Sequence, residues 1–534
     1  MADAIKKLIS DTRQLGEGIY LLYFALMVGA RAAGLYEGMT IYNISLVLGL
    51  GLFVLKMIVT QHTVKEYVVA ALFLALGGIV YIHTGEKGLF VCFTMMLGMK
   101  GVSTVKAIRT GGIVAGVFII FKVFHGVFGL LPEIYYPQER DGVGLMFRHA
   151  LGYAHPNTLH MNVLMLTMML MFLLTVALMR NHDVNTQRMS RFVLILASVM
   201  GFMFNVYIFL YSGSRTGLLA SFIYLFINAY LYLRGKIGIF EKICLYISFP
   251  FVCFISIVLP FLLDGDLFEF VDRTVFTTRF SLARYFWSNN HISLFGIRLV
   301  NPQENLKTYG IDMAQLYLFL QLGLVAFVVI AALTIWFINR AIKKDMRAEL
   351  AVLMGMLFLG MWEPLLYNLG FKNFIYVFMG QLLYEALSGA TFTESECTEK
   401  SLSFFQDINP ELMKTTLSII SISLVVGIVA STLYLTSTKT PDYLYGDREQ
   451  SEAGESFGMD PMYISETELA QIEGRGNIVI GYVDETVPMY QFGPEIAEME
   501  YQKRAVSFGV WSGAFAMICL LLLNKRRKRY NANV

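Results

Sequence analysis

Apolar runs of about 20 residues alternate with short polar stretches along most of this chain, and a helix of that length spans a bilayer. The pattern predicts about fourteen transmembrane helices. Their ranges are 18–36, 41–60, 67–83, 88–105, 111–131, 157–179, 192–211, 216–233, 243–262, 314–338, 348–369, 371–388, 413–437 and 505–523. The first run lacks a small-residue cleavage site and is too long for a cleavable signal.

Lys and Arg gather in every second connecting segment, and they end in the run Lys525–Arg529. Because such segments face the cytoplasm, both termini are predicted to be cytoplasmic. Two termini on one side require an even number of spans. The segments left on the other side include two long loops, 263–313 and 438–504.

The composition agrees with this pattern and narrows the class of protein. Of 534 residues, 56% are hydrophobic and only 15% are charged, with a mean hydropathy of +0.58. A soluble globular chain carries about 25% charge, so a soluble enzyme, a disordered chain and a nucleic-acid binder are excluded. The fold class predicted is an all-α polytopic integral membrane protein, with a small α/β or irregular external segment near the C-terminus.

Cysteine usage and the missing motifs exclude further classes. Four cysteines fall within the predicted spans and Cys397 lies in an inner segment, so no disulfide framework is implied. The sequence has no Cys/His cluster with zinc spacing, no Gly-rich phosphate loop and no internal repeat. It therefore argues against an ATP-driven pump with its own motor, and we expect neither a metal nor a cofactor.

The polar chemistry concentrates in three predicted external segments, 132–157, 211–217 and 263–313. In the second, Arg215 lies in the Ser/Gly-rich turn between two helices. Backbone N–H groups, a helix N-terminus and a guanidinium together suit phosphate. An interfacial Arg that reaches lipid head groups is an equally good interpretation.

The third segment contains Arg279 and Arg284 in a stretch predicted to be helical, with Asp272 and Asp312 as the nearby acids. Several arginines could hold a diphosphate. Taken alone, an amphipathic helix on anionic lipid is somewhat favoured.

The first segment places Arg148, His155 and Asn157 close to the start of a helix that begins with Pro156. His155 could donate to a phosphate or carry a proton near pH 7. For Asn157, a capping role is as good an interpretation as a catalytic one.

Two further ionisable residues fall within predicted spans, Lys122 and Glu363. Charges inside a membrane are costly, so each is a functional candidate. Glu363 ranks higher because it is predicted at the depth of the external arginines. Lys122 could simply pair with an acidic side chain on a neighbouring helix.

Three motifs follow one another in a set order: Arg148…Gly152-Tyr153-Ala154-His155-Pro156-Asn157, then Ser212-Gly213-Ser214-Arg215, and then Thr278-Arg279…Trp287…Leu294-Phe295-Gly296 with Ile311-Asp312…Gly323-Leu324. Over roughly residues 20–390 this order resembles the O-antigen polymerase and ligase family (Wzy type), in particular Gram-positive capsule and exopolysaccharide repeat-unit polymerases.

The resemblance implies a metal-independent glycosyltransferase at the cell membrane, with its active site on the extracytoplasmic side. Such enzymes join oligosaccharide repeat units carried on a polyprenyl (undecaprenyl) diphosphate. Carried over to this chain, Arg215 and Arg279 would bind the diphosphate, and Arg148 and His155 would support the same site, with Arg284 nearby. The partners implied are the lipid-linked oligosaccharide, the lipid bilayer, and chain-length regulator and flippase proteins, with no nucleic acid.

The general base is where this chain departs from the family, because ligases of the family tend to have a His near the end of the long loop, where this chain has Asp312. The candidates are Asp312 first, Glu363 second and His291 third. The competing interpretation of Asp312 is a helix N-cap before the span 314–338.

Two domains are predicted: a polymerase core at 1–390 and a two-span hairpin at 391–534. The hairpin's external segment 438–504 holds 14 acidic and 5 basic residues, a net charge of −9, and a predicted strand at 477–483. It resembles the topology of chain-length regulators. A regulatory or partner-binding appendage and a disordered spacer are about equally good interpretations.

The main rival function is a lipid-linked oligosaccharide flippase or another secondary transporter. Transporters usually have repeated halves and broken helices at the membrane midplane, and the sequence has no such symmetry. A structural scaffold is the third hypothesis, and it would not need this set of arginines.

Overall fold

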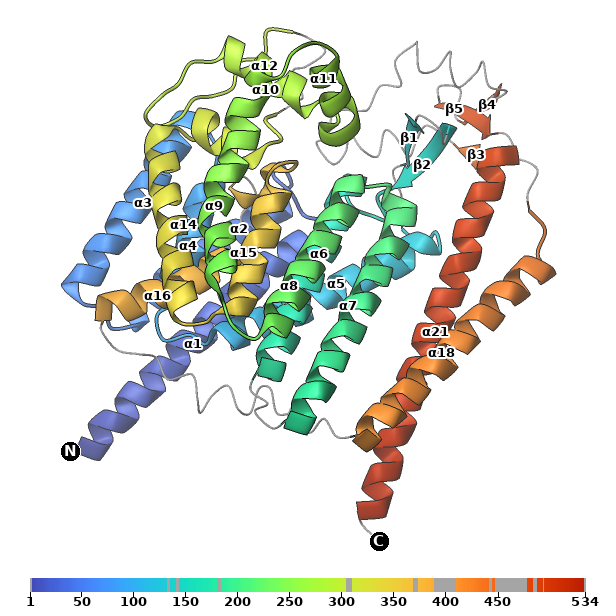
Figure 1. Ribbon diagram of the computed structural model, residues 1–534, viewed down its shortest axis with the longest axis horizontal. Helices are drawn as coiled ribbons and strands as arrows, with labels where there is room; N and C mark the ends of the chain where they lie inside the picture. Colours follow the sequence, from blue (N-terminus) through green and yellow to red (C-terminus); the bar gives the residue numbers. More distant parts are fainter. Residues whose placement is uncertain are drawn as a thin grey trace.

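The computed structural model describes residues 2–131, 135–140, 144–179, 184–303, 310–367, 373–388, 410–440, 444–446, 478–483, 487–492 and 494–532. Helices dominate it (Figure 1). Up to the end of the first half they are α1 (Ala2–Ala32), α2 (Thr40–Val59), α3 (Val64–Thr84), α4 (Gly88–Leu97), α5 (Thr104–Val127), α6 (Pro156–Met179), α7 (Val184–Ser212), α8 (Arg215–Arg234), α9 (Ile239–Cys253) and α10 (Leu259–Leu262).

The second half of the chain is helical too, but its helices are more often interrupted. They are α11 (Gly265–Phe270), α12 (Arg279–Asn289), α13 (Ala314–Leu316), α14 (Leu324–Lys343), α15 (Arg347–Leu359), α16 (Ile375–Ser388), α18 (Pro410–Ser437) and α21 (Pro494–Ala532). The π-helical segments η1 (Phe254–Val258), η2 (Val271–Phe276) and η4 (Tyr317–Gln321) and the 3₁₀ turn η5 (Pro364–Leu366) lie between them.

Eleven helices in the described residues are long and apolar enough to cross a membrane, so the protein is an α-helical multi-pass membrane protein. The prediction of continuous spans at 88–105, 348–369 and 371–388 is wrong. The structure has α4, α15 and α16 there, of 10, 13 and 14 residues. At about 1.5 Å per residue, each is shorter than the hydrocarbon core. Residues 368–372, which include the end of the predicted span 348–369 and the start of 371–388, lie outside the described part.

The predicted span 314–338 is also interrupted. After η4, the chain turns at Gly323, whose φ is +95°, and α14 begins at Leu324. A Cβ on Gly323 would overlap the backbone at Gly296, and a Cβ on Gly296 would overlap the Gln321 carbonyl. The N–H of Ile297 donates to that carbonyl at 3.0 Å. The two glycines of the sequence motifs therefore allow one close backbone crossing.

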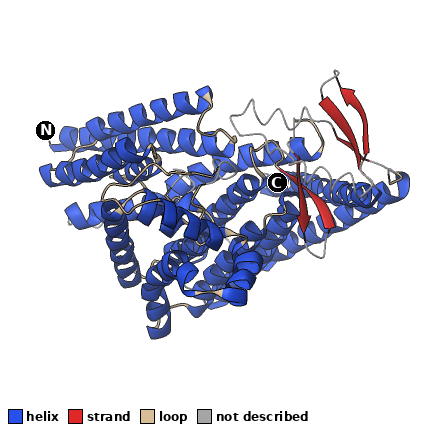
Figure 2. Cartoon of the chain, turned by 90° about the horizontal axis from the view of Figure 1, so that it is seen from above, coloured by secondary structure: helices blue, strands red, loops and turns tan. Residues whose placement is uncertain are grey.

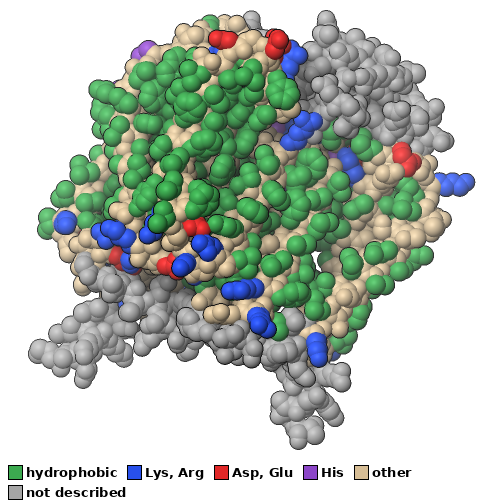
Figure 3. Space-filling model, viewed as in Figure 1, with side chains coloured by type: hydrophobic (Ala, Val, Ile, Leu, Met, Phe, Trp, Pro, Cys, Tyr) green, Lys and Arg blue, Asp and Glu red, His purple; other side chains and the backbone are tan. Residues whose placement is uncertain are grey.

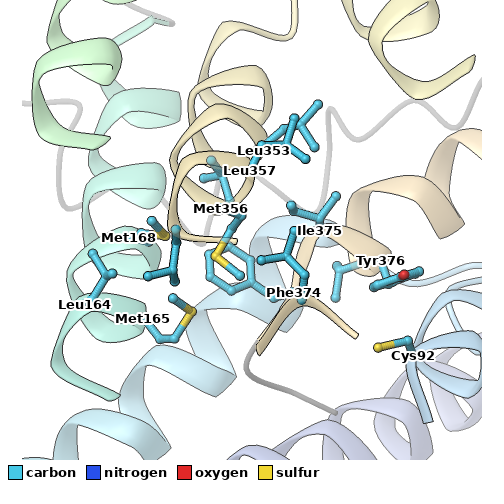
Figure 4. Packing of buried hydrophobic residues seen from close by; sticks show 14 of the residues in the cluster. Cys92, Leu164, Met165, Met168, Leu353, Met356, Leu357, Phe374, Ile375 and Tyr376 are labelled. Atoms are coloured by element: carbon cyan, nitrogen blue, oxygen red, sulfur yellow. The ribbon is translucent and has the colours of Figure 1, made fainter. Parts of the chain in front are cut away.

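The core forms where the short helices meet the long ones. α15 packs against α8 and α6, and α16 packs against α4. Figure 4 shows Met165 and Met168 of α6 close to Met356 of α15 and Phe374. Flexible methionine side chains fill irregular gaps between helices that end at different depths. The short helices are hence buried inside the bundle rather than exposed to lipid.

Short strands form two small sheets at one side of the helices (Figure 2). β1 (Tyr135–Arg140) pairs antiparallel with β2 (Gly144–His149), and Tyr136 lies opposite Arg148. β5 (Val487–Phe492) lies between β3 (Leu444–Gly446) and β4 (Ile478–Val483). β4 confirms the strand predicted at 477–483, and its external location stays a prediction. Most of 389–412 and 438–493 lies outside the described residues.

The two chain ends lie at the same end of the helix bundle (Figure 1). We call the opposite end, where α11, α12, β1 and β2 lie, the loop end. On the face shown in Figure 3, hydrophobic side chains cover the helices, and Lys and Arg gather toward the chain ends. This arrangement suits the predicted even number of spans. Cytoplasmic termini stay a prediction.

Candidate functional site

Arg148 is held by two segments that follow it in the sequence. Its Nε donates to the Ser212 carbonyl at 2.8 Å, and its Nη2 donates to Asn157 Oδ1 at 2.6 Å. Gly213, with φ +57°, leaves room for this side chain, because a Cβ there would lie 3.1 Å from Arg148 Cγ. The first and second polar segments of the sequence thus meet at one guanidinium.

Asn157 carries the contact onward to a third segment. Its Nδ2 donates to Glu363 Oε1 at 3.3 Å, while Nδ1 of His155 accepts the Asn157 N–H at 3.1 Å. The cap at the start of α6 is therefore made by His155, which leaves the Asn157 amide to link Arg148 with Glu363. The sequence had left a capping and a catalytic role open for Asn157.

Glu363 lies where α15 stops. The helix ends at Leu359, and Glu363 itself has an extended backbone before η5. The Gly360 carbonyl at this break accepts the N–H of Ala314 at 2.8 Å, so α13 starts against the end of α15. Unwound backbone within a bundle is tolerated where protein surrounds it. Glu363, with 11% of its side chain exposed, is buried in this break.

Arg279 binds to the same break. Its Nε donates to the Trp362 carbonyl at 2.6 Å, and its Nη2 lies 3.6 Å from Glu363 Oε1 and 3.6 Å from Asp312 Oδ2. One buried guanidinium consequently lies between two carboxylates. Together with Asn157 and Arg148, these residues form a continuous chain of polar contacts, which we call the Arg148–Asp312 relay. Its members are Arg148, Asn157, Glu363, Arg279 and Asp312.

The backbone leading to Arg279 is strained. Thr277 and Thr278 have φ values of +51° and +69°, a region that β-branched residues rarely adopt. Asp272 stabilises this turn, because its Oδ1 accepts the N–H of Phe280 at 2.9 Å. Asp272 therefore caps α12 rather than facing the arginines. Strain of this kind costs about 1–3 kcal/mol for each residue and is concentrated at functional sites.

Asp312 pairs with Arg279 and does not cap a helix. The residue at the N-cap of α13 is Met313, and no side chain caps that end. Burial among protein atoms raises the pKa of Asp312, and the Arg279 guanidinium partly offsets the rise. Its side chain nevertheless keeps 41% exposure, against 11% for Glu363. Asp312 is the more accessible of the two carboxylates.

Arg284 lies apart from the relay. Five residues along a helix rotate by about 140°, so Arg279 and Arg284 leave α12 in different directions. The Arg284 guanidinium donates to the carbonyls of Pro260 and Leu263, pairs with Asp264 at 3.0 Å and covers the Phe268 ring at 3.8 Å. It stabilises the end of α10 and the start of α11.

Arg215 and His155 lie at the edge of the relay. Arg215 is the first residue of α8, next to the turn whose Ser212 carbonyl accepts from Arg148. It is exposed, and it forms no ion pair within the described residues. Burial, with a contribution from Arg148, lowers the pKa of His155 to about 3, so its ring is neutral at pH 7. This finding disfavours a proton-carrying role for His155.

The remaining candidates have simpler positions. Lys122 donates to the Gly152 carbonyl and lies 4.7 Å from the Tyr153 ring centre, so it supports the turn before α6. His291 is exposed in the segment after α12. In the described residues, no group of three or more His, Cys, Asp and Glu side chains could hold a metal ion.

The sequence motifs include Ser212 only as part of the turn before Arg215, and Trp362 belongs to none of them; both residues contribute through their carbonyls. The Trp362 indole also donates to the Val275 carbonyl at 3.0 Å, and its ring stacks on Phe276 at 5.6 Å. These contacts join the break after α15 to the turn before Arg279. The sequence feature that could have pointed to Trp362 is Trp362-Glu363-Pro364, where an aromatic residue, an acid and a helix breaker follow one another.

No protein-family model, curated protein or solved structure matches this chain. Its class therefore rests on its own features: an α-helical multi-pass membrane protein with a partly buried relay of two guanidinium groups, an amide and two carboxylates.

Proposed function

We propose that this protein is a polysaccharide polymerase that joins polyprenyl-diphosphate-linked oligosaccharide repeat units on the outer face of the cytoplasmic membrane. One observation carries the proposal: Arg279 lies between Asp312 and Glu363 at a break in a buried helix, and Asn157 links this group to Arg148. Transfer of a glycosyl group from a lipid diphosphate requires both kinds of group. A guanidinium stabilises the leaving diphosphate, and a carboxylate accepts the proton of the attacking hydroxyl.

In the proposed reaction, a hydroxyl of the incoming unit attacks the anomeric carbon of the growing chain. A new C–O bond forms and the bond from that carbon to the lipid diphosphate breaks. The hydroxyl proton passes to a carboxylate, and the electron pair of the broken bond leaves with the diphosphate. Negative charge grows on the leaving diphosphate, where preorganised arginines can stabilise it without a metal ion.

The charge balance of the relay assigns a role to Arg215. Arg148 and Arg279 contribute two positive charges, which ionised Glu363 and Asp312 offset within the relay. A diphosphate needs further positive charge. Exposed Arg215 stands at the N-terminus of α8, where the helix dipole adds to its charge. We assign the first contact with the diphosphate to Arg215 and the stabilisation of the leaving group to Arg279 and Arg148.

Asp312 is the proposed base, with Glu363 as the second candidate. Its greater exposure lets a substrate hydroxyl reach it, and its raised pKa makes it a stronger base than a free aspartate. Glu363 already accepts from Asn157 and faces Arg279 from the buried side. Its proposed task is to orient the Arg279 guanidinium.

A secondary transporter, such as a lipid-linked oligosaccharide flippase, is the second candidate. The observation in its favour is the break after α15 together with the break at Gly323, because transporters place substrates at discontinuous helices. The charged groups of the relay would then bind the lipid diphosphate during translocation.

One experiment separates the two functions. Cells that carry Arg279→Lys or Asp312→Asn are examined for surface polysaccharide and for the location of lipid-linked repeat units. The proposed polymerase predicts single repeat units on the outer surface without long polymer. Repeat units that stay inside would favour the transporter, and normal polymer from both variants would contradict both roles of the relay.

A further inference from the structure

The part of α21 at the loop end binds β2 through a buried charged group. Lys503 Nζ donates to the Phe147 carbonyl at 3.0 Å and lies 2.6 Å from Glu500 Oε1. The other oxygen of Glu500, Oε2, is 2.8 Å from His149 Nε2. His149, Glu500 and Lys503 are 5%, 6% and 7% exposed, so this contact excludes water. Within this low-exposure contact, every charged group has a partner.

The same stretch of α21 also binds the end of α7. Tyr211 OH donates to the Lys503 carbonyl at 3.1 Å and lies 2.6 Å from Ser507 Oγ. Ser507 also meets Tyr207 OH at 3.0 Å, and the Trp511 indole donates to Tyr207 OH at 3.2 Å. This polar seam joins α21 to α7 at the loop end.

These contacts surround the Arg148–Ser212 hydrogen bond. Arg148 lies between Phe147 and His149, and both of these residues bind α21. Ser212, which accepts from Arg148, directly follows Tyr211, which also binds α21. Both sides of the hydrogen bond are therefore held by one helix. That helix belongs to the C-terminal hairpin, which the sequence separates from the core.

We infer that α21 is a positioning element for Arg148, with Glu500 and Lys503 as its positioning residues. They hold β2 against α7 so that the Arg148 guanidinium stays on Ser212 and Asn157. The C-terminal hairpin is thus part of the working site and not a spacer. The catalytic consequence rests on the proposed function, whereas the positioning itself does not.

The catalytic arm of the test is a double-mutant cycle on the purified full chain in lipid nanodiscs, with polyprenyl-diphosphate oligosaccharide as substrate. Glu500→Gln keeps the shape of the side chain and removes its charge. We expect about a 10- to 100-fold fall in kcat with a much smaller change in KM, as for a misplaced catalytic group. In an Arg148→Lys background, Glu500→Gln should cause little further loss. If the falls in kcat of the two single variants multiply in the double variant, the inference is overturned.

Two variants serve as comparisons. Glu498→Gln is the matched control, because Glu498 is exposed on the same helix, and it should behave as wild type. Tyr211→Phe removes the hydroxyl contacts with Lys503 and Ser507 without touching the buried charges. It should reproduce the fall in kcat. Wild-type activity in both Glu500→Gln and Tyr211→Phe would overturn the inference.

The second arm needs no activity. Hydrogen exchange of backbone amides at 144–149 and 211–214 is compared in wild type, Glu500→Gln and Glu498→Gln. Faster exchange at both segments in Glu500→Gln alone supports the positioning role, and unchanged exchange overturns it. If the wild-type protein makes no polymer, the proposed function fails, and this arm still decides whether α21 positions β2.

Discussion

The Nη2 atom of Arg279 lies 3.6 Å from Oε1 of Glu363, in a pair formed by α12 and the residues that follow α15. The backbone carbonyl just before Glu363 accepts from Arg279 Nε at 2.6 Å. The guanidinium is therefore fixed by main chain as well as by charge. Such a fixed group can stabilise charge that develops during a reaction with little reorganisation.

Arg279→Lys should abolish most polymerisation although the charge is kept. A lysine has one nitrogen, so it cannot bind the Trp362 carbonyl and face two carboxylates at once. We expect a loss of about 100-fold or more in kcat, as for removal of one preorganised donor. The measurement is polymer formation by purified protein. Arg298→Lys is the control, because Arg298 is exposed in the same segment, 263–313, and an equal loss there would contradict a specific role.

Asp312→Asn should lower kcat by about 10²–10⁴-fold, the usual contribution of a general base. It should leave stability unchanged or slightly raised at pH 7. In the folded protein the pKa of Asp312 is raised, so its ionised form is disfavoured on folding. The stability it contributes is present below its unfolded pKa and is lost as pH rises through the folded pKa. Any Tm advantage of the variant should therefore vanish in acid.

Glu363→Gln is the comparison for the choice of base. If Glu363 only orients Arg279, Glu363→Gln should lower kcat but keep the fall in rate at acid pH. Asp312→Asn should remove that fall, because the proposed base is gone. Loss of the fall in Glu363→Gln alone would transfer the role of base to Glu363.

Replacing His155 should change stability rather than a protonation step near neutral pH. The pKa of His155 is lowered to about 3, so its cap on α6 is fully present above the unfolded pKa of about 6.5. That stability is lost as pH falls from about 6.5 toward the folded value. His155→Ala should cost about 1 kcal/mol at pH 7.5, as for other N-caps. Thermal unfolding at several pH values measures both effects, and a kinetic pKa near 6.5 that disappears in His155→Ala would contradict this reading.

Gly296→Ala and Gly323→Ala should each destabilise the protein strongly. Both residues have a positive φ, and an added Cβ would overlap backbone of the opposite segment. We expect at least about 2–3 kcal/mol of destabilisation, because strain and overlap add. Gly78→Ala is the matched control. Gly78 lies in α3 with nothing near its Cβ, so that variant should gain about 0.5–1 kcal/mol. Equal unfolding temperatures for all three variants would refute the packing argument.

The apolar runs predicted the long helices well, because a hydrophobic stretch is a local property that a bilayer selects by length alone. The breaks in the predicted spans 314–338 and 348–369 were missed because they do not depend on a local property of the sequence. Leu359 ends α15, and Gly323 separates η4 from α14, inside apolar runs where neighbouring segments, not the local sequence, satisfy the freed backbone groups.

The sequence by itself determined that this is a helical membrane protein. It identified the ionisable residues in its predicted spans, where a charge is costly without a function or a partner. It also ranked Glu363 above Lys122 and pointed to Asp312. Only the tertiary structure decided that Arg279 joins these carboxylates while Arg284 supports another turn. Contacts between segments distant in the sequence depend on how the helices pack. Arg279 and Arg284 are close in sequence, but the rotation along α12 points their side chains toward different neighbours.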